Sequence, residues 1–332
     1  MRLRAGKLPV ALLRRVIRYT GSADPAVVIG PRFGEDAAVI DLGDRYLILK
    51  SDPVTFTTHE IGWYAVHVNA NDIAVMGARP RWFQTTLIAP PGTDDRVIRD
   101  ILRDVHLAAR RLRIAVTGGH TEISPAVTQP VIAGDMQGLV ARNRLVTSAG
   151  VRPGDRILLT KWVAIEGTSI LARERAQIVR RLLGERHQRT AARFHHRPGI
   201  SVVQEALIAA RSGATALHDP TEGGVAAGLY ELSAASGCQI DIDLDRIPIH
   251  PFTAALCAHF EISPLGLIAS GSLLAAVPDG QLNKMLRRLQ TAEIPATVIG
   301  TAHSGMGVRA RRAGKRVRFV WSERDEITRV LT

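Results

Sequence analysis

The chain has 332 residues, 46% of them hydrophobic and 22% charged, a balance that excludes an intrinsically disordered protein and suits two globular domains. Its formal net charge is +12, but only 5% of the residues are aromatic, so the stacking platform of a single-strand binder is not predicted and nucleic acid is not an expected partner. No apolar run reaches the ~20 residues that span a bilayer, and residues 1–6 lack the apolar core of a signal peptide, so we expect a cytoplasmic protein without membrane contact.

The first half of the chain predicts a mixture of helices and strands. A helix over 8–19 precedes two extended segments, 37–41 and 46–50, whose connecting turn predicts a β-hairpin. A long helix is predicted over 60–76, because Gly77 and Pro80 follow it in the usual order of helix stop signals. Next come a strand over 82–89, a capped helix ending near 113, and strands over 114–117 and 130–141, with Gly118 and Gly119 expected to end the first of these two strands.

The second half repeats this mixture without a regular alternation. A turn at 151–155 leads into a strand over 156–160, which places a domain boundary near residue 150 and predicts domains 1–150 and 151–332. Helical patterns cover 168–183, 201–212 and 225–235, and strand patterns cover 240–244, 271–277 and 296–299. Irregular alternation favours an α+β fold in each half over a regular parallel sheet.

Two local features of the chain have simple structural interpretations. Cys238 and Cys257 have no CxxC partner and no nearby histidine set, so we interpret both as small buried residues and expect neither a disulfide framework nor a zinc site. The basic run over 309–316 is interpreted as a solvated face, and a nucleic-acid role would rest on charge alone.

Four aspartates of this basic chain are candidate ligands, and most of them fall near breaks between predicted elements: Asp36, Asp52, Asp72 and Asp219. A hairpin would bring Asp36 and Asp52 to the same end of a sheet, where they could share a cation. Carboxylates gathered in one cleft repel one another unless a divalent ion neutralises them, and magnesium prefers such oxygen ligands together with nucleotide phosphates. An aspartate taken alone is more often a turn or helix-cap residue than a metal ligand.

Glycine-rich stretches accompany these acids. Gly118 and Gly119 follow a predicted strand, and Gly223 and Gly224 open a predicted helix, so both pairs can present backbone N–H groups to a phosphate. Neither stretch matches the Walker A loop or the GxGxxG fingerprint, which excludes the P-loop and Rossmann interpretations. A Gly-Gly pair by itself also marks an ordinary tight turn.

The order of these motifs resembles the superfamily of aminoimidazole ribonucleotide synthetase, thiamine-monophosphate kinase, selenophosphate synthetase and the hydrogenase maturation factor HypE, also called PurM-like. The resemblance runs from Gly34 to about Gly300 and rests on three stretches: Gly34-Glu35-Asp36-Ala37-Ala38, Asn71-Asp72-Ile73-Ala74-Val75-Met76-Gly77-Ala78, and Asp219-Pro220-Thr221-Glu222-Gly223-Gly224. It implies an N-terminal α+β domain that pairs with its copy in a homodimer to form a β-barrel, and a C-terminal α/β sandwich domain.

The same resemblance implies ATP and Mg²⁺ as cofactors. Carried over by position, the metal ligands are Asp36, Asp52, Asp72 and Asp219, with Glu35 standing where the family has its first aspartate. The nucleotide-binding residues are Gly118, Gly119, His120, Thr121, Glu122, Lys161, Glu222, Gly223 and Gly224. His120 could donate to phosphate or be structural, and Lys161 could add a cation or be an ordinary surface lysine. Catalytic residues are not assigned, with His120 and Glu222 as candidates.

Details of the motifs favour HypE within the superfamily, because His120 stands where thiamine-monophosphate kinases usually carry an aspartate. HypE proteins end in Pro-Arg-Ile-Cys, whose thiol accepts a carbamoyl group, whereas this sequence ends in Val330-Leu331-Thr332. A threonine hydroxyl is hardly ionised near neutral pH and is a poor carbamoyl acceptor. We therefore expect a HypE-like paralogue that keeps the nucleotide machinery.

Three functions follow as expectations. The first is a Mg-dependent, ATP-using enzyme that activates an amide, acyl or phosphate acceptor, with an anionic second substrate favoured by the basic charge. The second is a thiamine-monophosphate kinase. The third is a non-catalytic nucleotide-binding partner in metallocentre assembly, such as that of a hydrogenase.

Overall fold

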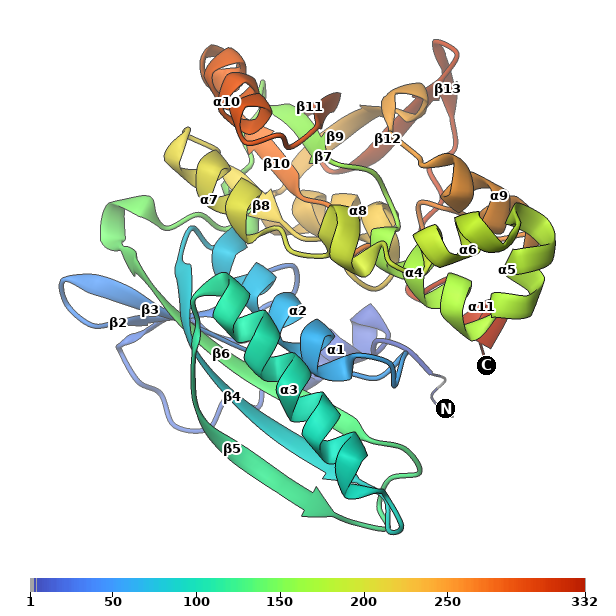
Figure 1. The fold of residues 1–332 in the computed structure, drawn as a ribbon. Coiled ribbons are helices and arrows are strands. Elements are labelled where there is room, and N and C mark those ends of the chain that lie inside the picture. The colour runs from blue at the N-terminus through green and yellow to red at the C-terminus, as the bar shows by residue number, and fades with distance from the viewer. Residues whose placement is uncertain (1–2, 4, 332) are drawn as a thin grey trace. The chain divides into compact units, whose positions relative to one another are not determined.

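The computed structural model describes residue 3 and residues 5–331, and it divides the chain into two compact units (Figure 1). The smaller unit consists of Asp24–Gly30 and Ala37–Leu145, and the larger unit consists of Met1–Ala23, Pro31–Asp36 and Val146–Thr332. Each unit combines helices with one mixed β-sheet, so the expected two-domain α+β fold is confirmed.

The smaller unit is a six-stranded sheet in the order β1-β2-β3-β6-β4-β5. Only the β4–β5 pair is parallel, and the other neighbours are antiparallel, including the expected hairpin of β2 and β3. Helices α2 and α3 pack together, and α2 contacts the sheet (Figure 1). The bounds are β1 Val27–Ile29, β2 Ala38–Asp41, β3 Arg45–Val54, α2 Ile61–Val75, β4 Arg79–Ala89, α3 Asp95–Leu112, β5 Ala115–Ile123 and β6 Val131–Ala141.

Helix α2 is buried along nearly its whole length. Gly62 allows α3 to approach closely, since a Cβ there would come within 2.2 Å of the carbonyl oxygen of Ile101. Helix α3 begins where Asp94, its N-cap, accepts a hydrogen bond from the backbone N–H of Arg96 (2.7 Å). Its apolar stripe, including Val105 and Ala109, is buried.

The larger unit is a seven-stranded sheet in the order β13-β12-β9-β11-β7-β10-β8, in which β12 and β9 are parallel. Helices α4, α5, α6 and α9 form one cluster beside it, whereas α8 packs on β9, β10 and β12 (Figure 1). The bounds are α1 Val10–Val16, β7 Arg156–Thr160, α4 Ile165–Glu174, α5 Ala176–Leu183, α6 Glu185–Ala191, α7 Val203–Arg211, β8 Ala216–His218, α8 Gly224–Ser236, β9 Cys238–Asp243, α9 Pro251–His259, β10 Leu274–Val277, α10 Asp279–Thr291, β11 Ala296–Ser304, β12 Gly307–Arg312, β13 Lys315–Val317 and α11 Thr328–Leu331.

Two predicted element boundaries are wrong for identifiable reasons. Gly118 and Gly119 do not end their strand but lie inside β5, paired with Gln84 and Thr85 of β4. The single helix expected over 168–183 is two helices, α4 and α5, which break at Arg175, where φ is −117°. Both predictions relied on local residue patterns that tertiary packing overrides.

Several other features agree with the sequence. Cys238 and Cys257 are both buried and free, and burial raises the pKa of the Cys257 thiol to about 12. The basic run forms an exposed hairpin of β12 and β13, whose Arg309 and Arg311 stand beside Asp241 and Asp243 of the neighbouring strand β9. Across residue 3 and residues 5–331, no helix combines the length and the apolar character that crossing a membrane requires.

Candidate functional site

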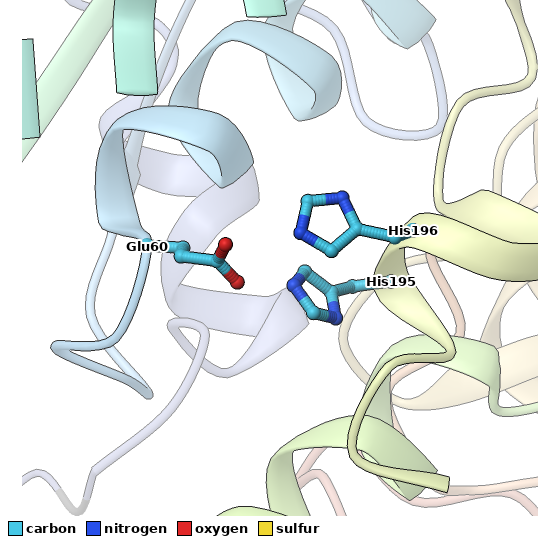
Figure 2. A group of neighbouring side chains, drawn as sticks. All are labelled: Glu60, His195 and His196. Atoms are coloured by element: carbon cyan, nitrogen blue, oxygen red, sulfur yellow. The ribbon is translucent and has the colours of Figure 1, made fainter. Parts of the chain in front are cut away.

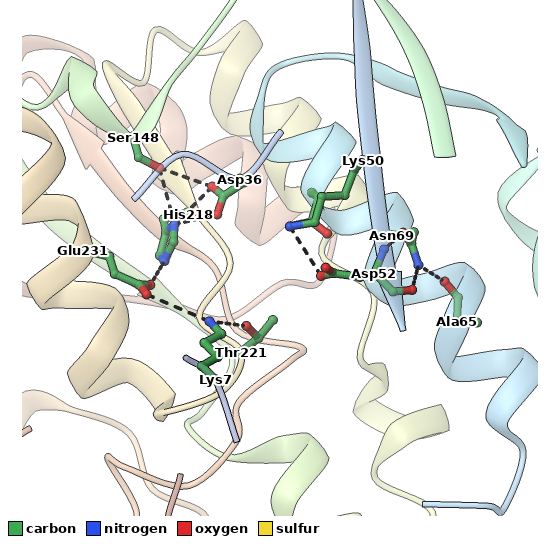
Figure 3. Close-up of polar contacts among 11 residues, drawn as sticks. Lys7, Asp36, Lys50, Asp52, Ala65, Asn69, Ser148, His218, Thr221 and Glu231 are labelled. Atoms are coloured by element: carbon green, nitrogen blue, oxygen red, sulfur yellow. Dashed lines mark hydrogen bonds and ion pairs between the residues drawn. The ribbon is translucent and has the colours of Figure 1, made fainter. Parts of the chain in front are cut away.

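Two of the predicted metal ligands, Asp52 and Asp72, lie together in the smaller unit. Asp52 is on β3, which extends beyond the predicted strand, and Asp72 is buried on α2. The Lys50 ammonium lies 3.4 Å from Oδ2 of Asp52 and 3.3 Å from Oδ1 of Asp72 (Figure 3 shows its pair with Asp52). Lys50 and Asp52 share a face of β3 because they are two residues apart. One cation therefore serves two carboxylates.

Asn69 fixes the backbone of β3 against α2 beside this group. Its Oδ1 accepts from the N–H of Asp52 (2.9 Å), while its Nδ2 donates to the carbonyls of Asp52 (3.1 Å) and Ala65 (2.8 Å) (Figure 3). Gly134 on β6 makes room for it, because a Cβ there would stand 2.5 Å from Nδ2. The sequence analysis did not identify Lys50 or Asn69, although the i, i+2 spacing of Lys50 and Asp52 was a usable signal.

A second cluster lies in the larger unit around Asp36. His218, the last residue of β8, places its Nδ1 2.9 Å from Oδ1 of Asp36 and its Nε2 3.0 Å from Oε2 of Glu231 on α8 (Figure 3). The Ser148 hydroxyl donates to Oδ2 of Asp36 (3.2 Å). Burial alone would lower the pKa of His218, but the two flanking carboxylates outweigh it and hold that pKa well above its usual range. The cluster is therefore a buried imidazolium between two carboxylates.

Glu35 has a structural role beside this cluster. Its carboxylate accepts from the backbone N–H groups of Ser148 (3.1 Å) and Ala149 (3.2 Å), which open a short 3₁₀ turn, Ser148–Gly150. Burial and the neighbouring Asp36 raise its pKa, and the two N–H donors partly oppose this. Glu35 thus joins the segment Pro31–Asp36 to the 3₁₀ turn Ser148–Gly150 within the larger unit, and no sequence pattern indicated this contact.

The segment after β8 carries Asp219 and the second glycine pair. Asp219 is 2% exposed. Gly223 and Gly224 have φ values of 80° and 63°, and a Cβ on Gly224 would stand 2.4 Å from the carbonyl oxygen of Leu265. Both glycines are therefore required by the backbone at the start of α8. The N–H of Gly223 donates to Oδ2 of Asp325 (2.6 Å).

Two further buried carboxyl groups accompany this glycine turn. Glu166, on α4, is 5% exposed, its Oε2 has no hydrogen-bond partner in the described part of the chain, and burial raises its pKa to about 7. Burial likewise raises the pKa of Asp325 to about 6, although three backbone N–H donors oppose the shift. Glu222 adds to both effects by its negative charge. Neither Glu166 nor Asp325 was singled out from the sequence.

The first glycine pair and its neighbours lie along β5. Strand β5 is an edge strand of the smaller sheet and is exposed along its length. A Cβ on Gly119 would stand 2.2 Å from the carbonyl oxygen of Thr85, so this position requires glycine. His120 and Glu122 are exposed and form a pair, with Nε2 and Oε2 3.5 Å apart. Thr121 lies between them on the strand.

Lys161, expected to be a surface residue if it did not bind phosphate, is buried. Its ammonium lies 2.7 Å from Oε1 of Glu205 and donates to the carbonyls of Ser201 (2.8 Å) and Gly199 (3.3 Å). The φ of Lys161 is 54°, a left-handed conformation immediately after β7. Its charge is therefore committed to a buried ion pair within the larger unit.

A pair of histidines in the larger unit was also missed. Figure 2 shows the imidazoles of His195 and His196 side by side, with ring centroids 4.0 Å apart; Glu60, also drawn there, belongs to the smaller unit. The ring of His195 is buried, and its Nδ1 lies 3.0 Å from the Ser169 hydroxyl. We therefore interpret His195 as a residue that packs against the cluster of helices α4, α5, α6 and α9.

The chain is similar to known proteins over nearly its whole length. Residues 34–140 match the AIR synthase related protein N-terminal domain, and residues 152–311 match the corresponding C-terminal domain. The carbamoyl dehydratase HypE of Rhodobacter capsulatus is 29% identical over 284 residues, 83% of this chain and 79% of that protein.

Two solved structures share the fold. One is hydrogenase maturation protein HypE in complex with ATP, with a TM-score of 0.74, 22% identity and coverage of 97% of this chain and 98% of that one. The other is AaThiL complexed with AMPPCP and TMP, with a TM-score of 0.73, 20% identity and coverage of 94% of each chain.

Proposed function

Because this chain belongs to the AIR synthase-related superfamily, whose members include ATP-dependent enzymes, we propose that it is a HypE-like, magnesium-dependent ATP-using enzyme. The proposed metal ligands are Asp36, Asp52, Asp72 and Asp219. The observation that carries the proposal is the position of the Lys50 ammonium between Asp52 and Asp72. Two carboxylates that share one cation form a group suited to a divalent ion on a triphosphate.

The residues present fit magnesium by their chemistry. Asp52 and Asp72 offer the hard oxygen donors that Mg²⁺ prefers, and their shared need for positive charge is met here by a lysine. Asp72 is only 3% exposed, so its charge requires such compensation. A bound magnesium ion would neutralise the charge that shifts toward the leaving group during phosphoryl transfer.

The remaining proposed residues bind the nucleotide phosphates or transfer a proton. Gly118, Gly119, Gly223 and Gly224, together with Thr121, Glu122 and Lys161, form the proposed nucleotide-binding set. The Lys161 ammonium is held by Glu205, so it would have to leave that ion pair to contact a phosphate. His120 and Glu222 are the candidates for handling a proton, since both are titratable and lie beside a glycine pair.

The proposed reaction activates an acceptor oxygen with ATP. An amide, carboxyl or phosphate oxygen attacks a phosphorus atom of ATP, and the nucleotide product leaves with the electrons of the broken bond. Similarity to carbamoyl dehydratase HypE supports an amide-type acceptor. The alternative, a thiamine-monophosphate kinase, is supported by the fold shared with AaThiL. A non-catalytic role in metallocentre assembly is the remaining alternative.

The test combines nucleotide binding with product analysis. Calorimetric titration of ATP with and without Mg²⁺ should show magnesium-dependent binding in the wild type and at least ~10-fold weaker binding for Asp72→Asn. Asp100→Asn, an exposed aspartate on α3, is the matched control and should bind like the wild type. Unchanged magnesium-dependent affinity of a folded Asp72→Asn variant would contradict the metal assignment.

Product analysis then separates the three functions. ADP formation that requires thiamine monophosphate indicates the kinase, and turnover that requires a carbamoylated peptide or another acceptor indicates the proposed enzyme. Magnesium-dependent binding without turnover of any acceptor in the panel indicates the assembly role.

We also propose that the protein is a homodimer that pairs through the smaller unit. Strand β5 is an unprotected sheet edge, with Val116 47% and Ile123 52% exposed. A long exposed edge with apolar side chains favours pairing with another strand. A second copy of β5, or of the adjoining sheet, is the partner that the family resemblance implies.

A further inference from the structure

The side chain of Asp36 is held by groups from two other parts of the larger unit. Asp36 ends the segment Pro31–Asp36, His218 ends β8, and Ser148 opens the 3₁₀ turn that follows the smaller unit in sequence. The His218 ring approaches both carboxylate oxygens, with Nδ1 2.9 Å from Oδ1 and 3.1 Å from Oδ2, and Ser148 donates to Oδ2. These donors define one orientation of the carboxylate.

The far side of the His218 ring is fixed as well. Its Nε2 lies 3.0 Å from Oε2 of Glu231, and the other oxygen of Glu231, Oε1, lies 3.9 Å from the Lys7 ammonium. Lys7 also donates to the Thr221 hydroxyl (3.4 Å; Figure 3). With a carboxylate on each ring nitrogen, His218 cannot rotate without losing a hydrogen bond on both sides. Glu231 thus sets the direction in which His218 points.

The side chains of Asp36, His218 and Glu231 differ in how far they are buried. The side chains of His218 and Asp36 are 5% and 9% exposed, and that of Glu231 is 17% exposed. Water has little access to the contact between His218 and Asp36, so it cannot readily replace either of these two partners. Gly34 allows this proximity, because a Cβ at this position would lie only 3.1 Å from the carbonyl oxygen of Glu231.

A carboxylate has about four lone-pair positions, and the contacts to His218 and Ser148 leave capacity on Oδ1 for a metal ion. Residues that hydrogen-bond to a metal ligand orient it, and losing one typically costs about 10–100-fold in metal affinity. His218 also precedes Asp219, a second proposed ligand, so the same residue anchors the backbone that carries it.

We infer that His218, held in place by Glu231, is a positioning residue that sets the Asp36 carboxylate for magnesium in the ATP complex. This inference rests on the assignment of Asp36 as a magnesium ligand under the proposed function. His218 and Glu231 touch neither the metal nor the nucleotide, and both act through Asp36.

The test measures how much Mg²⁺ half-saturates ATP binding, in the full-length protein, for His218→Gln, Glu231→Gln and Asp36→Asn. His218→Gln is expected to raise that Mg²⁺ concentration about 10–100-fold. ATP affinity measured in EDTA should stay within about twofold of the wild type, since the nucleotide itself is not touched. Electron paramagnetic resonance with Mn²⁺ in place of Mg²⁺ should show the same order of weakening.

A matched control separates positioning from simple loss of stability. Asp155 is another buried carboxylate of the larger unit, where it accepts from the Thr215 hydroxyl (2.6 Å) and the N–H of Arg152 (2.8 Å). Asp155→Asn should lower the melting temperature as His218→Gln does, but leave the Mg²⁺ requirement unchanged. A Mg²⁺ requirement that rises equally in Asp155→Asn would overturn the inference.

The outcomes for Asp36→Asn distinguish this inference from the proposed function. If Asp36→Asn weakens the response to Mg²⁺ but folded His218→Gln and Glu231→Gln do not, the positioning role is wrong and the metal assignment stands. If Asp36→Asn itself responds like the wild type, the metal assignment fails, and the inference fails with it. Should His218→Gln not fold, Glu231→Gln decides, because it keeps an oxygen acceptor for Nε2–H while removing the charge that holds the ring.

Discussion

Asp325 accepts a 2.6 Å hydrogen bond from the backbone N–H of Gly223, a residue 102 positions earlier in the chain. The other carboxylate oxygen, Oδ1, accepts from the N–H groups of Ile327 (2.8 Å) and Ile268 (3.2 Å). One buried side chain therefore joins three backbone segments: the glycine turn before α8, the loop before β10 and the segment leading to α11. We therefore expect Asp325 to contribute to the stability of the larger unit.

Asp325→Ala is expected to destabilise the larger unit by about 2–4 kcal/mol, because it leaves buried backbone N–H groups without an acceptor. Urea unfolding followed by circular dichroism measures this loss. Glu323→Gln, which changes an exposed carboxylate two residues away, should stay within about 0.5 kcal/mol of the wild type. A loss for Asp325→Ala no larger than that of Glu323→Gln would show that the three contacts contribute little.

The buried carboxyl of Glu166 should make stability depend on pH. Its pKa is raised from 4.5 to about 7, chiefly by burial. Below pH 4.5 the group is protonated in both states; between 4.5 and about 7 the unfolded chain releases a proton that the folded protein keeps, so stability falls as pH rises. The free energy of unfolding should be about 3 kcal/mol lower above pH 7 than below pH 4.5.

Glu166→Gln removes this ionisation and should flatten the stability curve between pH 4.5 and 7. Thermal or urea unfolding at several pH values measures the slope. Asp325, with its pKa raised to about 6, acts in the same direction and leaves a residual slope in the variant. An identical pH profile for wild type and Glu166→Gln would rule out the proposed ionisation.

The main elements could be predicted because their signals are local. The apolar pattern and stop signals of α2, and the capping segment before α3, are encoded within a few residues, and the predicted helix over 60–76 lies close to the bounds of α2. The motif aspartates could likewise be selected from short segments. By contrast, β5 continues through two glycines because β4 pairs with it, and Lys161 is buried because Glu205 meets it there.

Several of the site residues that were missed have partners that are distant in sequence. His218 and Asp36 are 182 positions apart, and Ser148 is 113 from Glu35, so neither contact leaves a periodic or motif signal. Glu166 and Asp325 owe their raised pKa values to burial, which depends on packing and not on neighbouring residue types. Lys50 is the exception, since its spacing to Asp52 was visible.

The glycine pair of β5 provides a paired test of backbone packing. Gly119→Ala should destabilise the smaller unit by about 2 kcal/mol or more, because the new Cβ would stand 2.2 Å from the Thr85 carbonyl oxygen. At Gly118 a Cβ meets no atom within 4 Å, so Gly118→Ala carries only the strain of its positive φ, roughly 1–2 kcal/mol. Equal losses in urea unfolding would show that the contact with Thr85 relaxes without cost.

The exposed edge strand predicts how the protein associates. Replacing Val116 and Ile123 with lysine places two charges on β5 and should convert a dimer to a monomer, because like charges on facing edges repel. Light scattering after size-exclusion chromatography measures the mass. The matched control is Leu182→Lys on α5, an exposed apolar residue of the larger unit, which should leave the mass unchanged. A wild-type protein that is monomeric at all concentrations would contradict the dimer.

Lys50 supplies the sharpest test of the carboxylate pair, because it makes stability respond to metal. In Lys50→Met the carboxylates of Asp52 and Asp72 lack their shared ammonium. The free energy of unfolding in EDTA should therefore fall by about 1–3 kcal/mol. The loss is smaller than for a fully buried pair because Lys50 is partly exposed. Added Mg²⁺ that binds the folded state should then raise the melting temperature of Lys50→Met more than that of the wild type, since the ion replaces the missing charge. Lys284→Met on α10, an exposed lysine, controls for the loss of one positive charge. If Mg²⁺ shifts all three melting temperatures equally, Asp52 and Asp72 do not bind the metal in the free protein, and their role would have to depend on the nucleotide phosphates.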